Sequence, residues 1–498
     1  MKIKTIQILF FLLNFSFGSF SNEVTVNQEY TDINMIKFGA IADGKTDNTN
    51  VIQNAIDKCS ESGGGVVFFP AGTYMSGSIF IKSNVTINLH KHAVLKGIAI
   101  SAYPDRRLGK NSGRMSFIQV DSVSNVTIMG EGTIDGNGDN EFFQMGNNGG
   151  PRPHLVQLHK SKNIVIKDVH LINAAFWTLQ LVENDGVRID GITIYSLNNW
   201  NNDGIDIDSK NVIISNCRID CDDDAICFKS SSYGGSLVEN VVITNCIIGS
   251  NCNFIKFGMS KVGFKSVTIT NCVLKPAAES NFRYWEKKTD GVTDPITGLN
   301  GIALEVVDGG IMDQITISNI VMTGIQTPIF IRLQQGRPRS AESQKTPVGS
   351  LKNVLISNIV ATAKSRIACS ITGIPGSYVE NIVVRDMIVN CMGGGTKDDV
   401  TRVIPERQNS YPDNWMFYSE LPGSSLRHAD LPAYGMYVRH AKNVYLDNIQ
   451  FNLMQPDYRP AIWIEDAKDV TLRSFRATQP SGNQDLIIKR ESVVKVLD

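Results

Sequence analysis

The stretch Asn211-Val212-Ile213-Ile214-Ser215-Asn216-Cys217 decides the fold, because its pattern returns along most of the chain. A polar residue, usually Asn, precedes two apolar positions that are separated by one residue. This alternation with a period of two indicates a β-strand. The copies follow one another at intervals of about 25 residues, as in solenoid proteins, with longer gaps where loops are inserted. They begin at Asn84, Asn125, Asn163, Asn211, Asn240, Asn353, Asn381 and Asn443, with weaker copies at Gly186, Ser266, Gln314 and Asp469.

Such a repeat without helices between its copies predicts an all-β protein, a single parallel β-helix in which each coil pairs with the next. Two residue types keep a constant place in the copies. We expect the Asn residues to stack about 4.8 Å apart as a ladder of amide hydrogen bonds. We expect the Cys residues to form a buried column, with disulfides possible but not required, and no metal site because no His accompanies them. The positions are Asn216, Asn245, Asn271, Asn319, Asn358 and Asn448, and Cys217, Cys246 and Cys272.

The composition agrees with a β-rich globular protein. The 498 residues include 42 Gly, which favours many turns. Lys and Arg number 48 against 49 Asp and Glu, a net charge of −1. This balance argues against a nucleic-acid partner, because phosphate contacts need an excess of basic residues. Nine Cys in so long a chain exclude a small disulfide-rich scaffold.

The N-terminus predicts a signal peptide over residues 1–21. Lys2 and Lys4 precede a mostly apolar run from Ile6 to Phe20, with small residues at its end. The run is too short for a convincing transmembrane helix, and an uncleaved anchor is the alternative. We therefore expect residues 22–498 to form one β-helix domain that is secreted or periplasmic and has no membrane contact after cleavage.

Two segments depart from the repeat. Residues 51–56 have the pattern of an amphipathic helix that ends near Gly63. We expect it to be an N-terminal capping helix that covers the first coil, because open strand edges promote aggregation. From about Gly393 to Pro432 the repeat is absent, which predicts a long insertion (residues 393–432) or the beginning of a C-terminal cover.

Two acidic clusters lie about one coil apart. The first is Asn201-Asn202-Asp203-Gly204-Ile205-Asp206-Ile207-Asp208, and the second is Cys221-Asp222-Asp223-Asp224-Ala225-Ile226-Cys227-Phe228-Lys229-Ser230. On adjacent coils they share one face, where carboxylates repel one another unless a proton, a cation or a substrate relieves the repulsion. Three interpretations are open: solvated turn residues, a calcium site, or the acid and base of glycosidic-bond hydrolysis, which needs one protonated and one ionised carboxyl group.

These clusters resemble glycoside hydrolase family 28, the polygalacturonase-like enzymes. The family's Asn-Thr-Asp motif is similar to Asn201-Asn202-Asp203 and its Asp-Asp pair to Asp223-Asp224, and the likeness extends from about residue 34 to at least 330. The resemblance implies a right-handed parallel β-helix and an inverting hydrolase that needs no metal and no other cofactor. It also implies that Asp223 is the general acid and that Asp203 and Asp224 hold and activate the water.

Two departures from the family concern its sugar-binding motifs. The family's Gly-His-Gly motif falls near Cys252-Asn253-Phe254, so that Asn253 stands where a His is usual. Its Arg-Ile-Lys motif, which recognises a galacturonate carboxylate, falls near Gly301–Glu305, so that Ala303 and Glu305 replace the two cations. Since Glu305 cannot pair with a carboxylate, we expect an uncharged sugar such as rhamnose on the leaving side.

The candidate substrate-binding residues are the polar and basic side chains at or near these motifs. For the cations among them, a surface position without a role in the site is the alternative. The candidates are Asn201, Asn253, Lys256, Arg283, Glu305, Arg332 and Arg337, with Arg339 beside the last.

The sequence therefore predicts a secreted glycoside hydrolase that cleaves a plant-type or algal polysaccharide of the pectin type, galacturonan or rhamnogalacturonan. A β-helical polysaccharide lyase that uses calcium is the first alternative. A glycan-binding β-helix without catalysis is the second.

Overall fold

The computed structural model describes residues 31–98, 103, 116–143, 152–230, 236–278, 298–336, 346–408, 413–420, 427–429, 431–482 and 485–497. The expected signal peptide over residues 1–21 lies outside these ranges. Among the described residues, none of the helices combines the length and the apolar character that a bilayer crossing requires.

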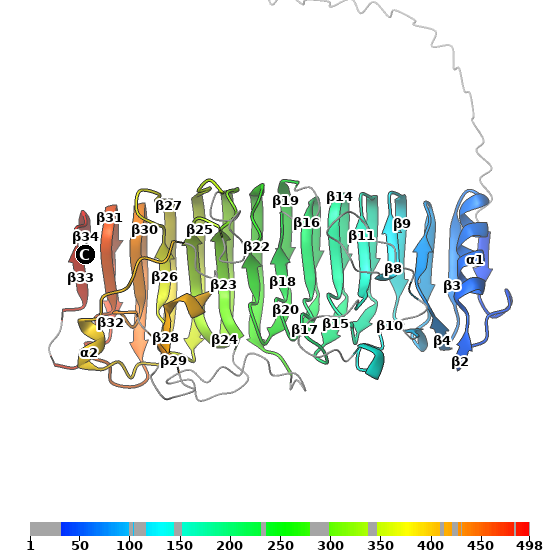
Figure 1. The fold of residues 1–498 in the computed structure, drawn as a ribbon, viewed down its shortest axis with the longest axis horizontal. Coiled ribbons are helices and arrows are strands. Elements are labelled where there is room, and N and C mark those ends of the chain that lie inside the picture. The colour runs from blue at the N-terminus through cyan, green and yellow to red at the C-terminus, as the bar shows by residue number, and fades with distance from the viewer. Residues whose placement is uncertain are drawn as a thin grey trace, which may run out of the picture.

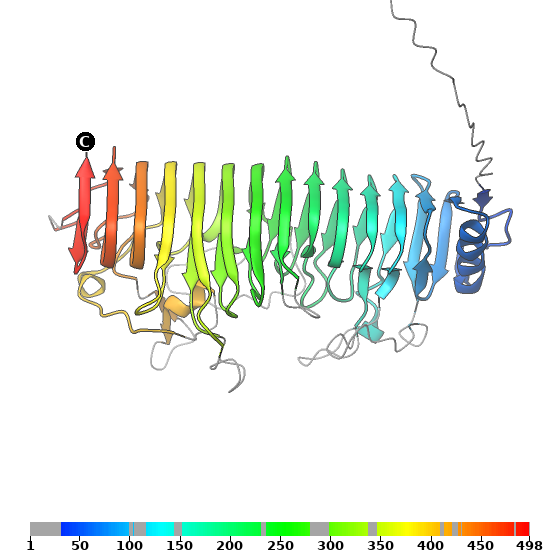
Figure 2. The ribbon, with the colours of Figure 1, turned by 90° about the horizontal axis from the view of Figure 1, so that it is seen from above.

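The described chain forms a long rod of stacked parallel strands, in which successive coils lie side by side (Figure 1, Figure 2). Thirty-two strands belong to one continuous sheet, and a two-stranded antiparallel sheet stands apart from it. The prediction of an all-β protein with parallel coils is confirmed.

The strands of the N-terminal half, through the second acidic cluster, are mostly short, with β14 and β16 as the longest. They are β1 (Thr31–Asn34), β2 (Asp43–Asp47), β3 (Gly65–Phe69), β4 (Gly72–Ser76), β5 (Ile79–Ile81), β6 (Val85–Leu89), β7 (Ala93–Gly97), β8 (Ser116–Asp121), β9 (Ser124–Gly130), β10 (Thr133–Asp135), β11 (His154–His159), β12 (Lys162–Lys167), β13 (His170–Ile172), β14 (Leu179–Asp190), β15 (Thr193–Ser196), β16 (Ile205–Ser215), β17 (Arg218–Cys221) and β18 (Ile226–Phe228).

Several strands of the C-terminal half are longer. They are β19 (Val238–Thr244), β20 (Ile247–Ser250), β21 (Ile255–Phe257), β22 (Gly263–Pro276), β23 (Gly298–Val306), β24 (Ile311–Leu333), β25 (Ser350–Ala363), β26 (Cys369–Thr372), β27 (Val379–Cys391), β28 (Tyr418–Glu420), β29 (Arg427–Ala429), β30 (Met436–Leu453), β31 (Ile462–Arg473), β32 (Arg476–Ala477), β33 (Ile487–Arg490) and β34 (Val494–Leu497). The helices are α1 (Thr49–Glu61), α2 (Lys397–Val400) and the 3-10 turns η2 (Glu141–Phe143) and η4 (Asn414–Phe417).

Stacking of the repeat in register builds the core. In β16, Val212 and Ile214 are buried whereas Ile213 is 48% exposed, as the period of two requires. Val212 pairs with Val187 of the preceding coil and with Val241 of the next. The same position continues through the rod as a column of buried β-branched side chains, which pack well on a pleated sheet. Its further members are Val267, Ile315, Val354, Ile382, Val444 and Val470.

The predicted Asn residues lie at corners of neighbouring coils. Asn271 has φ 57°, in the left-handed region that Asn tolerates better than most residues. Asn319 Nδ2 donates to Asn271 Oδ1 at 3.0 Å, and Asn358 Nδ2 donates to Asn319 Oδ1 at 2.9 Å. The first Asn of the repeat forms a second ladder that the sequence did not predict, for example from Asn125 Nδ2 to Asn84 Oδ1 at 3.0 Å.

The predicted Cys column is also present. Cys217, Cys246 and Cys272 are buried in the core. Each thiol donates to the carbonyl oxygen two residues earlier, at 3.1 to 3.2 Å. All nine Cys are buried free thiols, so these side chains serve packing.

The helix α1 lies at the N-terminal end of the rod (Figure 1). Its buried face consists of Ile52, Ala55, Ile56 and Cys59, and it contacts β1, β3 and β5. An amphipathic helix is therefore present where the sequence predicts one.

The segment 393–432 carries α2, η4 and the antiparallel pair β28–β29, and the repeat resumes in β30. Met416 and Phe417 of this segment pack against Ala303 and Phe330 in a second apolar cluster. Because side chains alternate along a strand, Ala303 and Phe330 lie on the face opposite to Ile302 and Leu304, which belong to the main core. The segment thus covers the outer face of the coils that follow the acidic clusters.

Candidate active site

Three neighbouring coils bring the two acidic clusters together. Asp206 in β16 pairs in register with Cys227 in β18, and Cys227 pairs with Lys256 in β21. The turns before these three strands therefore stack on one another. They carry the candidate residues Asp203, Asp223, Asp224 and Asn253.

The carboxylates of the clusters are buried. The exposed fraction is 3% for Asp203 and 8% for both Asp223 and Asp224. Burial of charge in this way is costly unless it is compensated. The interpretation as solvated turn residues is wrong for these three groups.

Lys229 compensates part of this charge. Its Nζ lies 2.8 Å from Asp203 Oδ2 and also contacts Asp206 Oδ1. The same ammonium lies 3.5 Å from the centre of the Trp177 ring, a cation–π contact. Burial alone would lower the pKa of Lys229, but the carboxylates of Asp203 and Asp206 together raise it well above its usual value. Burial raises the pKa of Asp203, and the charge of Lys229 opposes this effect.

Asp223 and Asp224 are adjacent, but their pKa values shift in opposite directions. Burial raises the pKa of Asp223 well above its usual value, and the negative charges of Asp203 and Asp224 act in the same direction. Burial also acts to raise the pKa of Asp224, but the charges of Lys256 and Lys229 and a hydrogen bond from Asn253 outweigh it, so that this pKa is lowered. One carboxyl group that keeps its proton beside one that loses it is the arrangement that acid/base catalysis needs.

Hydrogen bonds reach both carboxyl groups, and those to Asp223 act against the rise of its pKa. Asn201 Nδ2 donates to Asp223 Oδ2 at 3.3 Å, and the backbone N–H of Asp224 donates to Asp223 Oδ1 at 2.9 Å. Asn253 Nδ2 donates to Asp224 Oδ1 at 2.7 Å.

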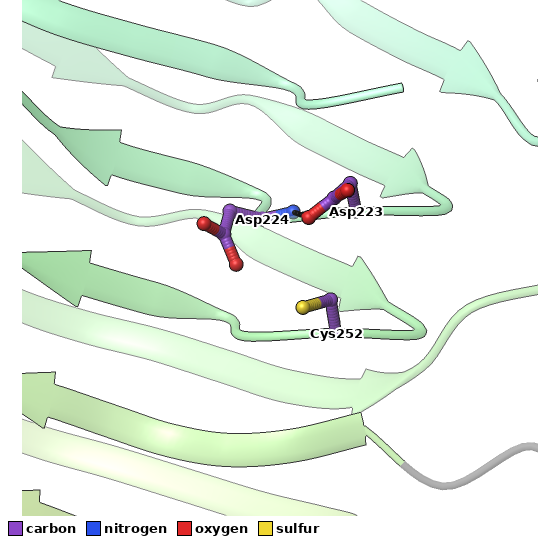
Figure 3. A group of neighbouring side chains, drawn as sticks. All are labelled: Asp223, Asp224 and Cys252. Atoms are coloured by element: carbon purple, nitrogen blue, oxygen red, sulfur yellow. Dashed lines mark hydrogen bonds between the residues drawn. The ribbon is translucent and has the colours of Figure 1, made fainter. Parts of the chain in front are cut away.

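Asp223 and Asp224 also lie close to a thiol, as Figure 3 shows. One oxygen of each carboxylate and the Sγ of Cys252 lie within 4.8 Å of one another. The ammonium groups of Lys229 and Lys256 contribute to the potential at Asp224, and calcium prefers a shell of six to eight oxygen ligands. We therefore interpret the cluster as an acid/base site.

The structure places some of the predicted substrate-binding residues at this cluster. Asn201 is exposed and contacts Asp223, and Asn253 is fully buried and contacts Asp224. Lys256 lies between two carboxylates, with its Nζ 3.8 Å from Glu305 Oε1 and 3.5 Å from Asp413 Oδ2. Glu305 has no exposed surface. We therefore expect it to affect substrate binding through its contact with Lys256.

The guanidinium group of Arg332 donates hydrogen bonds to backbone carbonyl groups of the protein. Its guanidinium donates to the carbonyl oxygens of Gly373, at 2.7 Å, and of Arg407. It is 4% exposed, and burial lowers its pKa to about 9. Arg283, Arg337 and Arg339 lie outside the described residues. A direct role of these cations in substrate binding stays a prediction.

Residues that the sequence analysis missed support the cluster from outside the repeat. Arg152 is buried, donates to Asn201 Oδ1 at 3.3 Å and lies over the Phe176 ring at 4.8 Å. It thereby holds the side chain that contacts Asp223. Asn300 and Asp413 are buried next to Asn253 and Lys256. None of the three occupies a position of the repeat, so no periodic signal marks them.

Residues 59–252 match the family model described as Glycosyl hydrolases family 28. Over this segment the chain is similar to that family. The matched segment contains Asp203, Asp223 and Asp224, so the predicted resemblance is confirmed where it bears on the acidic clusters.

Individual relatives agree with the family match. The chain is 34% identical to a probable polygalacturonase of Vitis vinifera over 220 residues, which are 40% of this chain and 45% of that protein. It is 28% identical to a probable rhamnogalacturonase A of Aspergillus oryzae over 221 residues, 44% of each chain. The chain thus spans less than half the length of either relative.

A solved structure shares the fold. The exopolygalacturonase from Thermotoga maritima superposes with a TM-score of 0.60 at 23% identity, covering 72% of this chain and 87% of that one. The family match and the relatives indicate a glycoside hydrolase.

Proposed function

We propose that this protein hydrolyses glycosidic bonds in a polysaccharide of the pectin type, galacturonan or rhamnogalacturonan. The observation that carries the proposal is the opposite pKa displacement of Asp223 and Asp224 within one buried cluster. The matched family segment and the polygalacturonase and rhamnogalacturonase relatives support the substrate class.

In the proposed mechanism, protonated Asp223 donates its proton to the glycosidic oxygen as the bond to the anomeric carbon breaks. Asp203 and Asp224 hold a water molecule on the opposite face of the sugar. Asp224 takes the proton of this water, because its pKa is the lowered one. Attack on the opposite face inverts the anomeric centre, and such enzymes leave about 6.5–9.5 Å between acid and base for the water.

Two residues prepare the acid and the base. Lys229 contacts Asp203 and Asp206, and its charge opposes the rise of their pKa that burial causes. Asn201, held by Arg152, orients Asp223. The mechanism uses no metal ion and no other cofactor.

The surroundings of Lys256 favour a neutral sugar on the leaving side. Two buried carboxylates, Glu305 and Asp413, already neutralise this ammonium. A galacturonate carboxylate would add negative charge beside the two buried carboxylates that already share Lys256, and an unpaired buried charge is costly. We therefore propose that plain homogalacturonan is a poorer substrate than a rhamnogalacturonan backbone.

The proposal extends to the whole chain. Residues 1–21 direct export to the periplasm or the exterior, and residues 22–498 form one domain. The solenoid winds to the right, the hand that parallel crossover connections almost always take, and α1 caps its first coil.

The deciding experiment is a product analysis on homogalacturonan and rhamnogalacturonan, with Asp223→Asn as the matched inactive variant. New reducing ends without ultraviolet absorbance, insensitive to a calcium chelator, support hydrolysis. An absorbing unsaturated product that disappears with the chelator identifies a lyase. Binding without product identifies a glycan-binding protein, and either of these results contradicts the proposal.

A further inference from the structure

We propose that Asp413 is a positioning residue for Asp224, acting through Asn300 and Asn253. The segment 393–432 then completes the active site. The inference rests on the proposed function in that Asp224 is the base of the reaction.

A continuous chain of short hydrogen bonds joins the two carboxylates. Asn300 Nδ2 donates to Asp413 Oδ1 at 2.6 Å and to Asn253 Oδ1 at 2.7 Å. Asn253 Nδ2 donates to Asp224 Oδ1 at 2.7 Å. Asn300 and Asn253 have no exposed surface and Asp413 is 2% exposed, so water does not compete for these bonds.

Asp413 sets the direction of donation along this series of hydrogen bonds. An ionised carboxylate only accepts hydrogen bonds, whereas an amide can present either its oxygen or its NH₂ group. Because Asp413 accepts, Asn300 must turn its NH₂ group toward the chain, where it also meets Asn253 Oδ1. Asn253 must then present its own NH₂ group to Asp224. Without Asp413, Asn300 can rotate its oxygen toward Asn253, and Asp224 alone then holds the NH₂ group of Asn253 in place.

Opposing effects act on the Asp413 carboxyl group. Burial raises its pKa, while Lys256 and hydrogen bonds from the Asn414 N–H and Asn300 favour the ionised form that accepts from Asn300. The groups that act on Asp224 include Lys256, Lys229, Asp203, Asp206, Asp223, Cys221, Cys227 and Cys252, together with Asn253 and Asp413. From the neighbouring coil, Lys256, Asn253 and Cys252 act to lower its pKa. Lys256 contacts Asp413 directly, whereas Asn253 is connected to Asp413 through the hydrogen bonds of Asn300.

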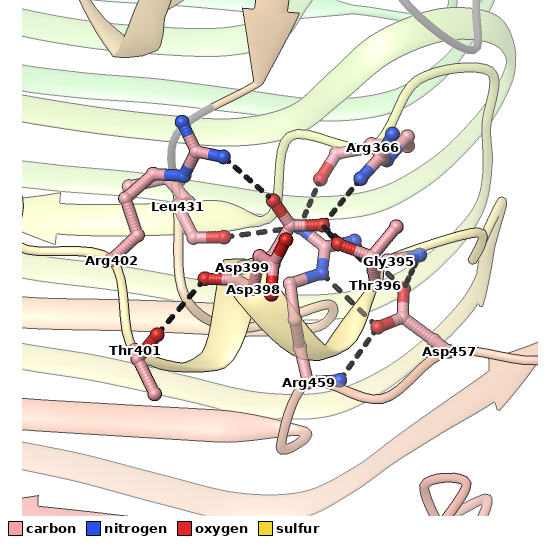
Figure 4. Close-up of polar contacts among 10 residues, drawn as sticks. All are labelled: Arg366, Gly395, Thr396, Asp398, Asp399, Thr401, Arg402, Leu431, Asp457 and Arg459. Carbon is pink, nitrogen blue, oxygen red and sulfur yellow. Dashed lines mark hydrogen bonds and ion pairs between the residues drawn. The ribbon is translucent and has the colours of Figure 1, made fainter.

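The segment is fixed firmly enough to position a side chain. Asn414 Nδ2 donates to the carbonyl oxygen of Leu299 at 3.3 Å and to Thr327 Oγ1 at 3.2 Å. At the base of the segment, Asp399 binds Arg366 at 2.6 Å and Arg402 at 3.2 Å, as Figure 4 shows. A side chain held by such packing is suited to set the geometry of a reacting group.

Two variants at one position separate the hydrogen bond from the charge. Asp413→Asn and Asp413→Ala both remove the negative charge, but only the Asn variant keeps an oxygen that Asn300 can donate to. We expect kcat of the Ala variant to be about tenfold below that of the Asn variant with similar KM, since small displacements of a reacting group are costly. We expect the acid limb of its pH profile at a higher pH, because a looser Asn253 bond raises the pKa of Asp224. Asp398→Ala, an exposed change in the same segment, should match the wild type.

A carbon-13 NMR titration of Asp-labelled protein, with the Asp224 signal assigned by Asp224→Asn, reads the same effect without turnover. The pKa of Asp224 should be higher in Asp413→Ala than in Asp413→Asn, and higher in Asn300→Ala than in the wild type. Asn300→Ala therefore also serves if Asp413→Ala does not fold. Equal acid limbs and equal Asp224 titrations overturn the inference. A wild-type protein that cleaves neither polymer contradicts the proposed function instead, and the titration then decides the inference alone.

Discussion

Two buried charge clusters in this molecule are built in opposite ways. At the base of the segment 393–432, the carboxylates of Asp399 and Asp457 meet the guanidinium groups of Arg366, Arg402 and Arg459. In the candidate active site, Asp203, Asp206, Asp223 and Asp224 share the two ammonium groups of Lys229 and Lys256. Cations outnumber carboxylates in the first cluster, and carboxylates outnumber cations in the second.

The ratio of cations to carboxylates indicates whether a buried charge cluster stabilises the fold or takes part in a reaction. A paired charge with its hydrogen bonds filled holds elements together, and removal of one partner is strongly destabilising. An excess of negative charge forces one carboxyl group to keep a proton, which is useful only where that proton is transferred. We expect substitutions in the two clusters to separate stability from turnover.

The largest effect is expected for Asp223→Asn. The amide keeps the shape but has no acidic proton to donate, so turnover should fall by about 10²- to 10⁴-fold. The midpoint of thermal unfolding should stay or rise, because the amide cannot acquire the charge that burial disfavours at Asp223. Release of reducing ends and a melting curve measure both. Asp203→Asn and Asp224→Asn should also be severe, and near-normal turnover in Asp223→Asn would show that another residue is the acid.

The opposite result is expected for Arg459→Met in the paired cluster. Arg459 is 1% exposed and lies 2.8 Å from Asp457. Its loss leaves a buried carboxylate without its partner, which should lower the free energy of unfolding by about 3–5 kcal/mol. Urea unfolding measures this change. Arg473→Met, at the more exposed pair with Asp447, is the control with a much smaller loss. An Arg459 variant as stable as this control contradicts the comparison.

The pH dependence of stability sharpens the comparison further. The folded protein binds the Asp223 proton more tightly than the unfolded chain, because the pKa of Asp223 is raised. This contribution is complete below the usual pKa of about 4 and is lost as the pH rises through the folded-state value. The wild type should therefore lose more stability than Asp223→Asn between about pH 4 and pH 7. Parallel curves from urea unfolding at each pH would refute this account.

The smallest effect is expected in an uncharged cluster, the Asn ladder. Asn271→Ala removes one amide pair and leaves a residue with a side chain at φ 57°. The cost should be about 1–2 kcal/mol, with no dependence on pH between about 4 and 7 because nothing titrates. Asn271→Gly, which relieves the backbone strain, separates the two contributions. A pH-dependent loss at this site would mean that the charged clusters are not the source of the pH effect.

The sequence predicts those parts of the site that obey the repeat. The offsets of Asn271 and Cys272 from the apolar positions define coils, and coils place Asp203 beside Asp223. Asp413 follows no such rule, because it lies in the segment without the repeat and meets Lys256 across 157 residues. The sequence gives no signal for Arg152 either, because this residue occupies no position of the repeat. Contacts made by a loop can be predicted only when its three-dimensional path is known, whereas contacts between coils can be predicted from the period of the repeat.

The late position of Asp413 in the chain has a consequence during synthesis. The coils that carry Asp224 can stack on one another while the rest of the chain is still being made, since each contacts only its neighbours. Asp413 leaves the ribosome after Asp224 by roughly 10–40 s, at about 5–20 residues per second. For that interval the nascent rod holds its acidic residues without the side chain that orients the base. The proposed base thus gains its positioning side chain only after the coils that carry the acidic residues have been made.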